Sequence, residues 1–200
     1  MRFFLIFAPT NILNIYTVKT ILFIIGSLRK QSFNRQLAKL AENMLSDRFN
    51  IRYLEFEDVP LMNQDLEAAT PEAMKRVRKE VLAADGIWIF TPEYNFSYPG
   101  LLKNLLDWLS RPMDISNFAN PSAVVGKKVT ASGAGGKNQT MSCRAKLNEL
   151  LEFIKMDVMK EPQTGITLGL EAWTKGEFAL TEEQKAQLKE QAEKFVKFIE

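Results

Sequence analysis

Histidine is absent from this chain of 200 residues, and cysteine occurs once, as Cys143. Without histidine the chain cannot form a Ser-His-Asp or Cys-His catalytic group, or a metal site with histidine ligands. A single cysteine excludes disulfides within the chain, CxxC redox motifs and iron–sulfur clusters. If the protein is an enzyme, its chemistry is therefore expected to come from a cofactor. Sparse cysteine is also typical of the cytoplasm, where we expect the protein.

A strong charge of either sign is also lacking. The chain has 26 lysines and arginines against 24 acidic residues, so its net charge is +2. No strong field would attract nucleic acid or an anionic membrane, and we expect neither as a partner. The hydrophobic content of 46% is ordinary for a globular chain of this length. A small molecule is therefore the expected partner.

The first 17 residues do not fit the pattern of the rest. They begin with the apolar stretch MRFFLIFAP, but Pro9, Asn11 and Asn14 interrupt it. The run is shorter than the roughly 20 residues of a membrane-spanning helix, and no A-x-A-like cleavage site follows. We expect residues 1–17 to be an accessory extension, or a start misread upstream of Val18. Residues 18–200 are expected to form one domain.

From residue 19 onward, apolar runs alternate with helical patterns. Strands are expected at 19–25, 51–56, 87–90 and 127–131, with a short fifth strand at 156–159. Helices are expected at 32–46, 70–84, 101–110, 140–154 and 181–199, with Thr70 and Thr181 as N-caps. The stretch 156–180 is otherwise irregular. This order predicts a three-layer α/β fold with a doubly wound, five-stranded parallel sheet of the flavodoxin-like type.

Three unusual loops follow strands of the predicted sheet. They are GSLRKQSFN after Ile25, TPEYNFSYPG after Phe90 and SGAGGKNQ after Ala131. In doubly wound sheets, ligands bind beyond the carboxyl ends of the strands. The three loops are therefore the candidate binding site.

The first loop has the composition of a phosphate site. Ser27, Arg29, Ser32 and Asn34 add donors beside a helix N-terminus, which itself attracts anions. Neither GxxxxGK[ST] nor GxGxxG is present, so a terminal monophosphate fits better than a pyrophosphate. The alternative is that the serines only cap the helix and that Arg29 is solvated.

The other two loops suit a flat ring. In the second, prolines stiffen a turn that holds Glu93, Tyr94 and Asn95, which could read the edge of a heterocycle. In the third, glycines at 133, 135 and 136 let the backbone approach a ring closely. Alternatively, the second is a turn in which Tyr94 packs locally and the third is a flexible connector. Together, a phosphate cradle and two ring-binding loops suggest flavin mononucleotide (FMN).

The motifs GSLRKQSFNRQLA, TPEYNFSYPGLLKNLLDWLSRP and GKKVTASGAGG resemble the NADPH-dependent FMN reductase family, and within it the chromate and quinone reductase branch. The resemblance covers residues 19 to at least 154. It implies a flavodoxin-like homodimer or homotetramer that binds FMN non-covalently. It also implies NAD(P)H as hydride donor and quinones, chromate, azo compounds or free flavin as acceptors.

The resemblance also implies a set of FMN-binding residues, and neither a metal nor a catalytic side chain. The phosphate and ribityl chain would be held by Ser27, Arg29, Ser32, Phe33 and Asn34. The isoalloxazine would be bordered by Pro92, Glu93, Tyr94 and Asn95, with Ser132 and Gly133 closing the site.

Two alternatives stay open. One is a flavodoxin-like electron carrier, although such carriers are strongly acidic and this chain is not. The other is a flavodoxin-like FMN-binding module without enzymatic activity, or one whose site is empty. Cys143 is expected to be a core residue rather than a redox thiol. Trp108 is expected in the core or at a dimer contact.

Overall fold

The computed structural model describes residues 18–117 and 119–200. Its strands are β1 (Thr20–Ile25), β2 (Asn50–Tyr53), β3 (Gly86–Phe90), β4 (Lys128–Gly135), β5 (Asp157–Val158) and β6 (Gly165–Thr167). Its helices are α1 (Phe33–Leu45), α2 (Glu72–Ala83), α3 (Gly100–Leu109), α4 (Met141–Phe153), α5 (Leu170–Lys175) and α6 (Glu182–Ile199), with a 3₁₀ turn at Gln64–Leu66.

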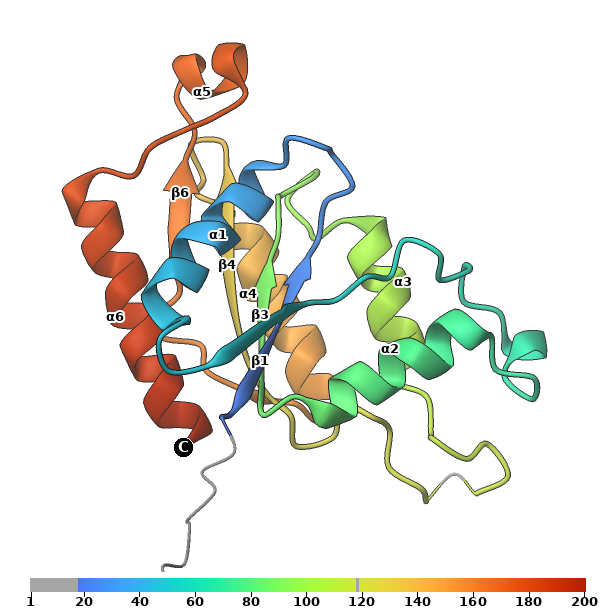
Figure 1. Ribbon diagram of the computed structural model, residues 1–200. Coiled ribbons are helices and arrows are strands. Elements are labelled where there is room, and N and C mark those ends of the chain that lie inside the picture. Colours follow the sequence, from blue (N-terminus) through green and yellow to red (C-terminus); the bar gives the residue numbers. More distant parts are fainter. Residues whose placement is uncertain (1–17, 118) are drawn as a thin grey trace, which may run out of the picture.

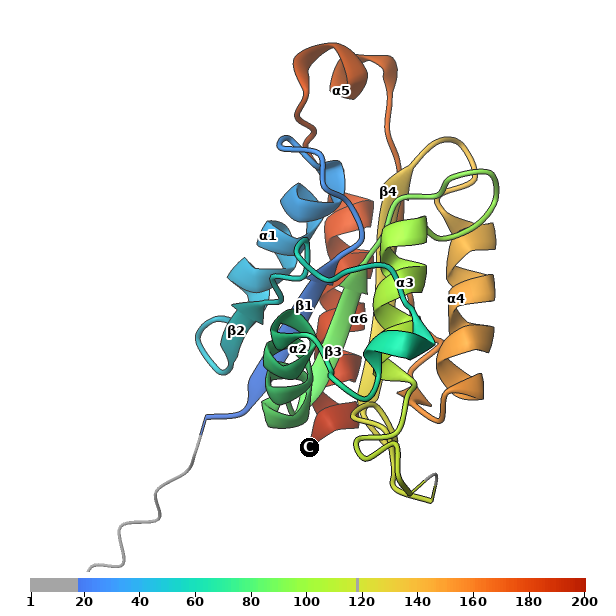
Figure 2. The same ribbon diagram turned by 90° about the vertical axis from the view of Figure 1, so that its right-hand side faces the viewer.

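The sheet confirms the predicted architecture. Its strand order is β2-β1-β3-β4-β5, and each of these neighbouring pairs is parallel. This is the flavodoxin-like order, in which the chain reverses direction across the sheet between β2 and β3. Helices α1 and α6 cover one face, and α2, α3 and α4 cover the other (Figures 1 and 2). The sixth strand, β6, pairs in parallel with the end of β4.

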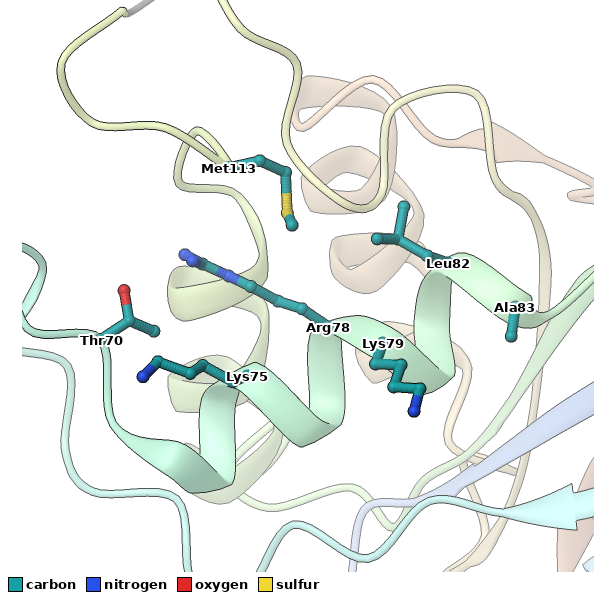
Figure 3. Close-up of a pocket in the computed structure, with 7 residues that line it drawn as sticks. All are labelled: Thr70, Lys75, Arg78, Lys79, Leu82, Ala83 and Met113. Atoms are coloured by element: carbon teal, nitrogen blue, oxygen red, sulfur yellow. The ribbon is translucent and has the colours of Figure 1, made fainter.

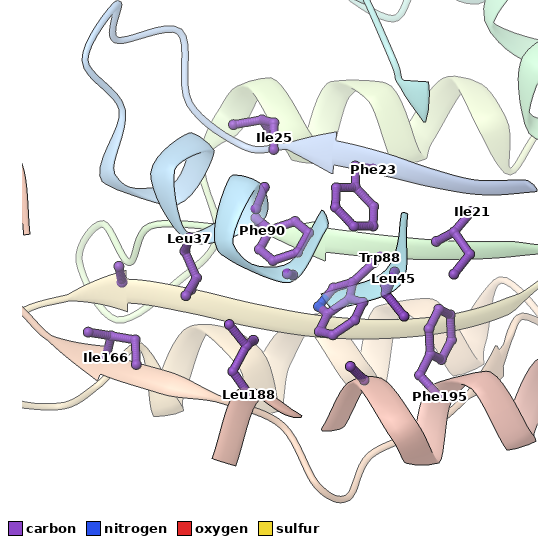
Figure 4. Packing of buried hydrophobic residues seen from close by; sticks show 14 of the residues in the cluster. Ile21, Phe23, Ile25, Leu37, Leu45, Trp88, Phe90, Ile166, Leu188 and Phe195 are labelled. Atoms are coloured by element: carbon purple, nitrogen blue, oxygen red, sulfur yellow. The ribbon is translucent and has the colours of Figure 1, made fainter. Parts of the chain in front are cut away.

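Alternate side chains of β1 supply both cores. Ile21, Phe23 and Ile25 face α1 and α6, whereas Leu22 and Ile24 face α2 and α3. On the α1–α6 side, Phe23 packs on Trp88 and Phe90, and the rings of Trp88 and Phe90 stack 5.3 Å apart (Figure 4). A strand buried on both faces must be apolar throughout, as the sequence of β1 predicts.

Two predicted N-caps have different outcomes. At α6, Thr181 Oγ1 accepts a hydrogen bond from Gln184 N (3.2 Å), and Gln184 Oε1 accepts one from Thr181 N (3.0 Å). This capping box confirms Thr181. The prediction for Thr70 is wrong, because Pro71 is the N-cap of α2. The Thr70 hydroxyl instead donates to the carbonyl oxygen of Glu67 (2.9 Å).

The end of β4 also differs from the prediction. Residues 132–135, expected in a loop, continue the strand because Gly133, Ala134 and Gly135 pair with β6. The stretch 156–180, expected to be mostly irregular, forms β5, β6 and α5. Ser132 and Gly133 therefore lie within the sheet rather than in a loop after it.

Trp108 lies fully inside the α2–α3–α4 core, so the core alternative is confirmed for it. Its indole Nε1 donates to the carbonyl oxygen of Pro60 (2.9 Å).

In the described residues, no helix is long and apolar enough to cross a membrane. The predicted accessory extension at 1–17 lies outside the described residues.

Candidate active site

Backbone hydrogen bonds bring the three loops together. Gly26 N donates to the carbonyl oxygen of Phe90 (2.8 Å), and Thr91 N donates to that of Ser132 (2.9 Å). In the sheet register, Ile25 lies beside Phe90, which lies beside Ser132. The loops therefore leave neighbouring strands side by side at the carboxyl edge, at the top of the sheet in Figure 2. This is where doubly wound folds bind ligands.

The first loop ends in a capped helix start. Ser32 is buried, and its Oγ accepts a hydrogen bond from Arg35 N (3.3 Å) as the N-cap of α1. The N–H groups that follow in the first turn lack partners within the helix. Arg29 is exposed, and its guanidinium lies 4.6 Å from the ring centre of Phe33. The loop thus offers backbone donors, the hydroxyl of Ser27 and two exposed cations, Arg29 and Lys30, to an anion.

Asn34 has a structural role that the sequence did not reveal. Its Nδ2 donates to the carbonyl oxygen of Ala134 (3.2 Å), and its Oδ1 accepts from Ala134 N (2.9 Å). The side chain is buried and ties the start of α1 to β4. The amide oxygen and one of the two amide N–H groups are therefore used within the protein, and we expect Asn34 to contribute to a phosphate site through its backbone N–H.

The second loop contains a tight turn with unusual backbone angles. Tyr94 and Ser97 exchange two backbone hydrogen bonds of 2.9 and 3.0 Å. Asn95 and Phe96 both have positive φ, at 52° and 58°, as in a type I′ turn. Positive φ is rare for a bulky residue such as phenylalanine, and strained backbone clusters at ligand sites. The turn holds the exposed rings of Tyr94 and Phe96 beyond the sheet edge.

Glu93 joins the second loop to the start of α4. Its Oε2 accepts a hydrogen bond from Cys143 N (2.8 Å), in the first turn of that helix. Its Oε1 accepts one from Asn138 Nδ2 (2.9 Å). A carboxylate at a helix N-terminus satisfies free N–H groups and the helix dipole. Glu93 therefore fixes the spacing between the second and third loops.

Ser132 and Gly133 are packed inside the protein. Ser132 Oγ accepts a hydrogen bond from Trp88 Nε1 (3.0 Å) and donates to Gln191 Oε1 (2.9 Å), so this hydroxyl belongs to the core beneath α6. At Gly133 a β-carbon would lie 2.2 Å from Thr140 Oγ1. Glycine is needed there because the protein itself crowds the position.

Helix α5 borders the site and was not predicted. The ring of Trp173 meets Phe33 edge to face, with ring centres 5.2 Å apart. Gln36 Nε2 donates to the carbonyl oxygen of Gly176 (2.8 Å), which holds the segment after α5 against α1. Figure 1 shows α5 beyond the carboxyl edge of the sheet. The sequence signals of this short element are Glu171 in its first turn, Lys175 in its last turn and the helix-ending Gly176.

Cys143 is buried, as expected of a core residue. Its Sγ lies 3.4 Å from the carbonyl oxygen of Pro92, and burial raises the pKa of the thiol to about 11.

At about pH 8 the folded protein should therefore react very slowly with a disulfide reagent such as DTNB, because only the thiolate of Cys143 attacks. The denatured chain should release the chromophore rapidly. Fast reaction in the folded state would contradict this burial.

Comparisons with known proteins place the chain in a family. The sequence profile of the NADPH-dependent FMN reductase family matches residues 20–170. A quinone reductase of Pseudomonas putida is 37% identical over 151 residues, covering 74% of this chain and 78% of that protein. A 2-hydroxy-1,4-benzoquinone reductase of a Burkholderia species is 35% identical over 141 residues, covering 70% and 74%.

A solved structure gives the same result. The flavoenzyme FerB, an NAD(P)H:(acceptor) oxidoreductase of Paracoccus denitrificans, superposes with a TM-score of 0.79 at 31% identity, covering 91% of this chain and 97% of FerB. Four observations indicate the same family: the flavodoxin-like fold, the loops at the carboxyl edge of its sheet, the family match and these relatives. The chain belongs to the NADPH-dependent FMN reductase family and is an oxidoreductase with FMN as cofactor and NAD(P)H as hydride donor.

Proposed function

We propose that this enzyme reduces quinones, with FMN bound across the three loops at the carboxyl edge of the sheet. The observation that carries the proposal is the pair of hydrogen bonds from Gly26 to Phe90 and from Thr91 to Ser132, which place these loops side by side. Relatives named as quinone reductases support the choice of acceptor. Chromate and azo compounds are further acceptors to be tested.

The donor set of the first loop fits the FMN phosphate. We assign the phosphate to the backbone N–H groups at the start of α1, the hydroxyl of Ser27 and the guanidinium of Arg29, with Ser32 and Phe33 shaping the loop. The isoalloxazine is assigned to the backbone of Pro92, Glu93, Tyr94 and Asn95, with Gly133 behind them. We assign Ser132 only an indirect role in the site, as part of strand β4, because its hydroxyl is hydrogen-bonded in the core.

The chemistry that FMN supplies when bound is electron transfer from NAD(P)H to an acceptor. The chain's own task is to hold the two ends of the cofactor at a fixed separation. Asn34 fixes α1 to β4, and Glu93 fixes the second loop to α4. No histidine is needed for this task, which agrees with the composition.

Replacing Arg29 by alanine is expected to weaken FMN binding by about 1–3 kcal/mol, the scale of one hydrogen bond to a charged group. The measurement is fluorescence titration of the apoprotein with FMN. Arg48→Ala is the matched control, because Arg48 is also exposed but lies at the opposite end of α1. Equal affinity of the two variants for FMN would remove Arg29 from the phosphate site.

The function is tested by the visible spectrum of the purified protein. We expect oxidised-flavin bands that bleach when NADPH is added without oxygen and return when a benzoquinone follows. A yellow protein that NADPH does not bleach would be an electron carrier instead. A colourless protein that takes up no added FMN would overturn the assignment of all three loops.

We propose further that the enzyme is a homodimer or homotetramer that acts in the cytoplasm, where NAD(P)H is available. Its support is a group of exposed apolar side chains around the site, namely Tyr94, Phe96, Met141, Leu170 and Trp173. Exposed apolar patches mark association surfaces. Sedimentation equilibrium measures the state directly, and a monomer at micromolar concentration would refute the proposal.

A further inference from the structure

A groove runs along α2, away from the three loops of the candidate active site. Its volume is about 590 Å³, within the range of small-molecule sites. It is lined by Thr70, Lys75, Arg78, Lys79, Leu82, Ala83 and Met113 (Figure 3). None of these residues belongs to the loops 26–34, 91–100 or 136–140. The groove is therefore a separate feature of the surface.

Arg78 is a buried cation in the wall of this groove. It is only 5% exposed, yet among the described residues its Nη2 makes a single long hydrogen bond to the carbonyl oxygen of Trp108 (3.4 Å), and its Nε has no hydrogen-bond partner there. The nearby carboxylate of Glu67 is held by Arg111, whose Nη2 donates to Glu67 Oε2 (3.0 Å). A buried guanidinium with unused donors is costly unless an acceptor reaches it.

The groove has a polar end and an apolar end. Figure 3 shows the hydroxyl of Thr70 and the ammonium of Lys75 at the same end as the guanidinium of Arg78. Leu82 lies toward the other end and Met113 lies above the groove, and both are exposed. Lys75 pairs with Glu72 (2.6 Å), but both side chains are largely solvent-exposed, so that pair leaves the lysine free to turn toward an anion.

We propose that this groove binds a small carboxylate with an apolar chain. The carboxylate accepts hydrogen bonds from Arg78 and Lys75, and the chain lies along Leu82 and Met113. Guanidinium groups match the planar, two-oxygen geometry of a carboxylate. Contact with the apolar wall buries the chain of such a ligand, and a small inorganic anion would not gain this stabilisation.

The test is isothermal titration calorimetry of the FMN-loaded, full-length protein with sodium decanoate. We expect binding at one site, and about tenfold weaker binding of 1-decanol, which has the same chain without the charge. Lys75→Gln should weaken decanoate binding about three- to fivefold. Arg78→Met should weaken it about tenfold or more, and Lys75→Gln keeps the test valid if Arg78→Met does not fold.

Lys185→Gln is the matched control. Lys75 and Lys185 each form an i,i+3 pair of 2.6 Å with a glutamate, and they are similarly exposed, at 58% and 52%. Lys185 lies on α6 and does not line the groove.

The proposal is overturned if decanoate does not bind, if decanol binds equally well, or if the two lysine variants behave alike. A second copy of the chain filling the groove would also overturn it, and would appear as a concentration-dependent loss of decanoate sites. The calorimetry does not use enzyme turnover, so its outcome is independent of the proposed quinone reduction.

Discussion

Replacing Gln191 by leucine is expected to lower the free energy of unfolding by about 3–5 kcal/mol. The side chain is fully buried on α6 and makes four hydrogen bonds. Oε1 accepts from Thr164 N (2.6 Å) and Ser132 Oγ (2.9 Å), and Nε2 donates to Thr130 Oγ1 (2.9 Å) and the carbonyl oxygen of Ala131 (3.0 Å). Leucine has a similar size but leaves these groups unpaired in the core, at about 1–3 kcal/mol each where no other partner is found.

The measurement is equilibrium unfolding in urea, followed by circular dichroism. Gln187→Leu is the control, because Gln187 lies on the same helix but is exposed. It should change the stability by less than about 0.5 kcal/mol. Similar losses of stability in both variants would show that the Gln191 hydrogen bonds contribute little. Both losses would then reflect only a change in helix propensity or solubility.

Replacing Gly133 by alanine is expected to destabilise the protein by about 3 kcal/mol or more, the upper range for overpacking. The new β-carbon would lie 2.2 Å from Thr140 Oγ1 and 2.5 Å from the carbonyl oxygen of Thr91. The threonine side chain can rotate, but the Thr91 carbonyl belongs to the backbone and cannot move alone. The clash therefore forces β4 away from the loop that follows β3, and FMN affinity should fall with stability.

Gly136→Ala is the control for this change. It makes the same substitution three residues later in the sequence, at a position where a β-carbon meets no atom within 4 Å. Thermal unfolding of both variants gives the comparison, and the melting temperature should fall only for Gly133→Ala. Equal melting temperatures would mean that β4 and the Thr91 loop adapt to a methyl group without cost.

Much of the sheet was predictable because each central strand has a local signature. ILFII of β1, after its first residue Thr20, and GIWIF of β3 are apolar at every position, as burial on two faces requires. The end of β4 was not predictable in this way. Its residues SGAG are small and read as a loop, and they form a strand because Gly133 pairs with Gly165, 32 positions away. Pairing at that distance leaves no periodic pattern in either segment.

The candidate site shows the same division. Its position followed from the order of the strands, whereas the N-cap role of Ser32 had been only the alternative to a role as phosphate donor, and the structure shows that role. The partners of Glu93 and Asn34 did not follow, because both reach residues far along the chain, Cys143 and Ala134. Helix α5 was missed because six residues are too short for a helical period to be recognised.

The placement of Trp173 gives the protein its own optical reporter. The chain has three tryptophans, of which Trp88 and Trp108 are fully buried, whereas Trp173 is 54% exposed and touches Phe33 beside the proposed phosphate loop. We expect acrylamide to quench only the Trp173 part of the emission, and bound FMN to shield that part from the quencher. Trp173→Phe should abolish both effects while leaving the buried emission intact. Arrival of the cofactor is thereby visible in ultraviolet fluorescence, without a label and without turnover.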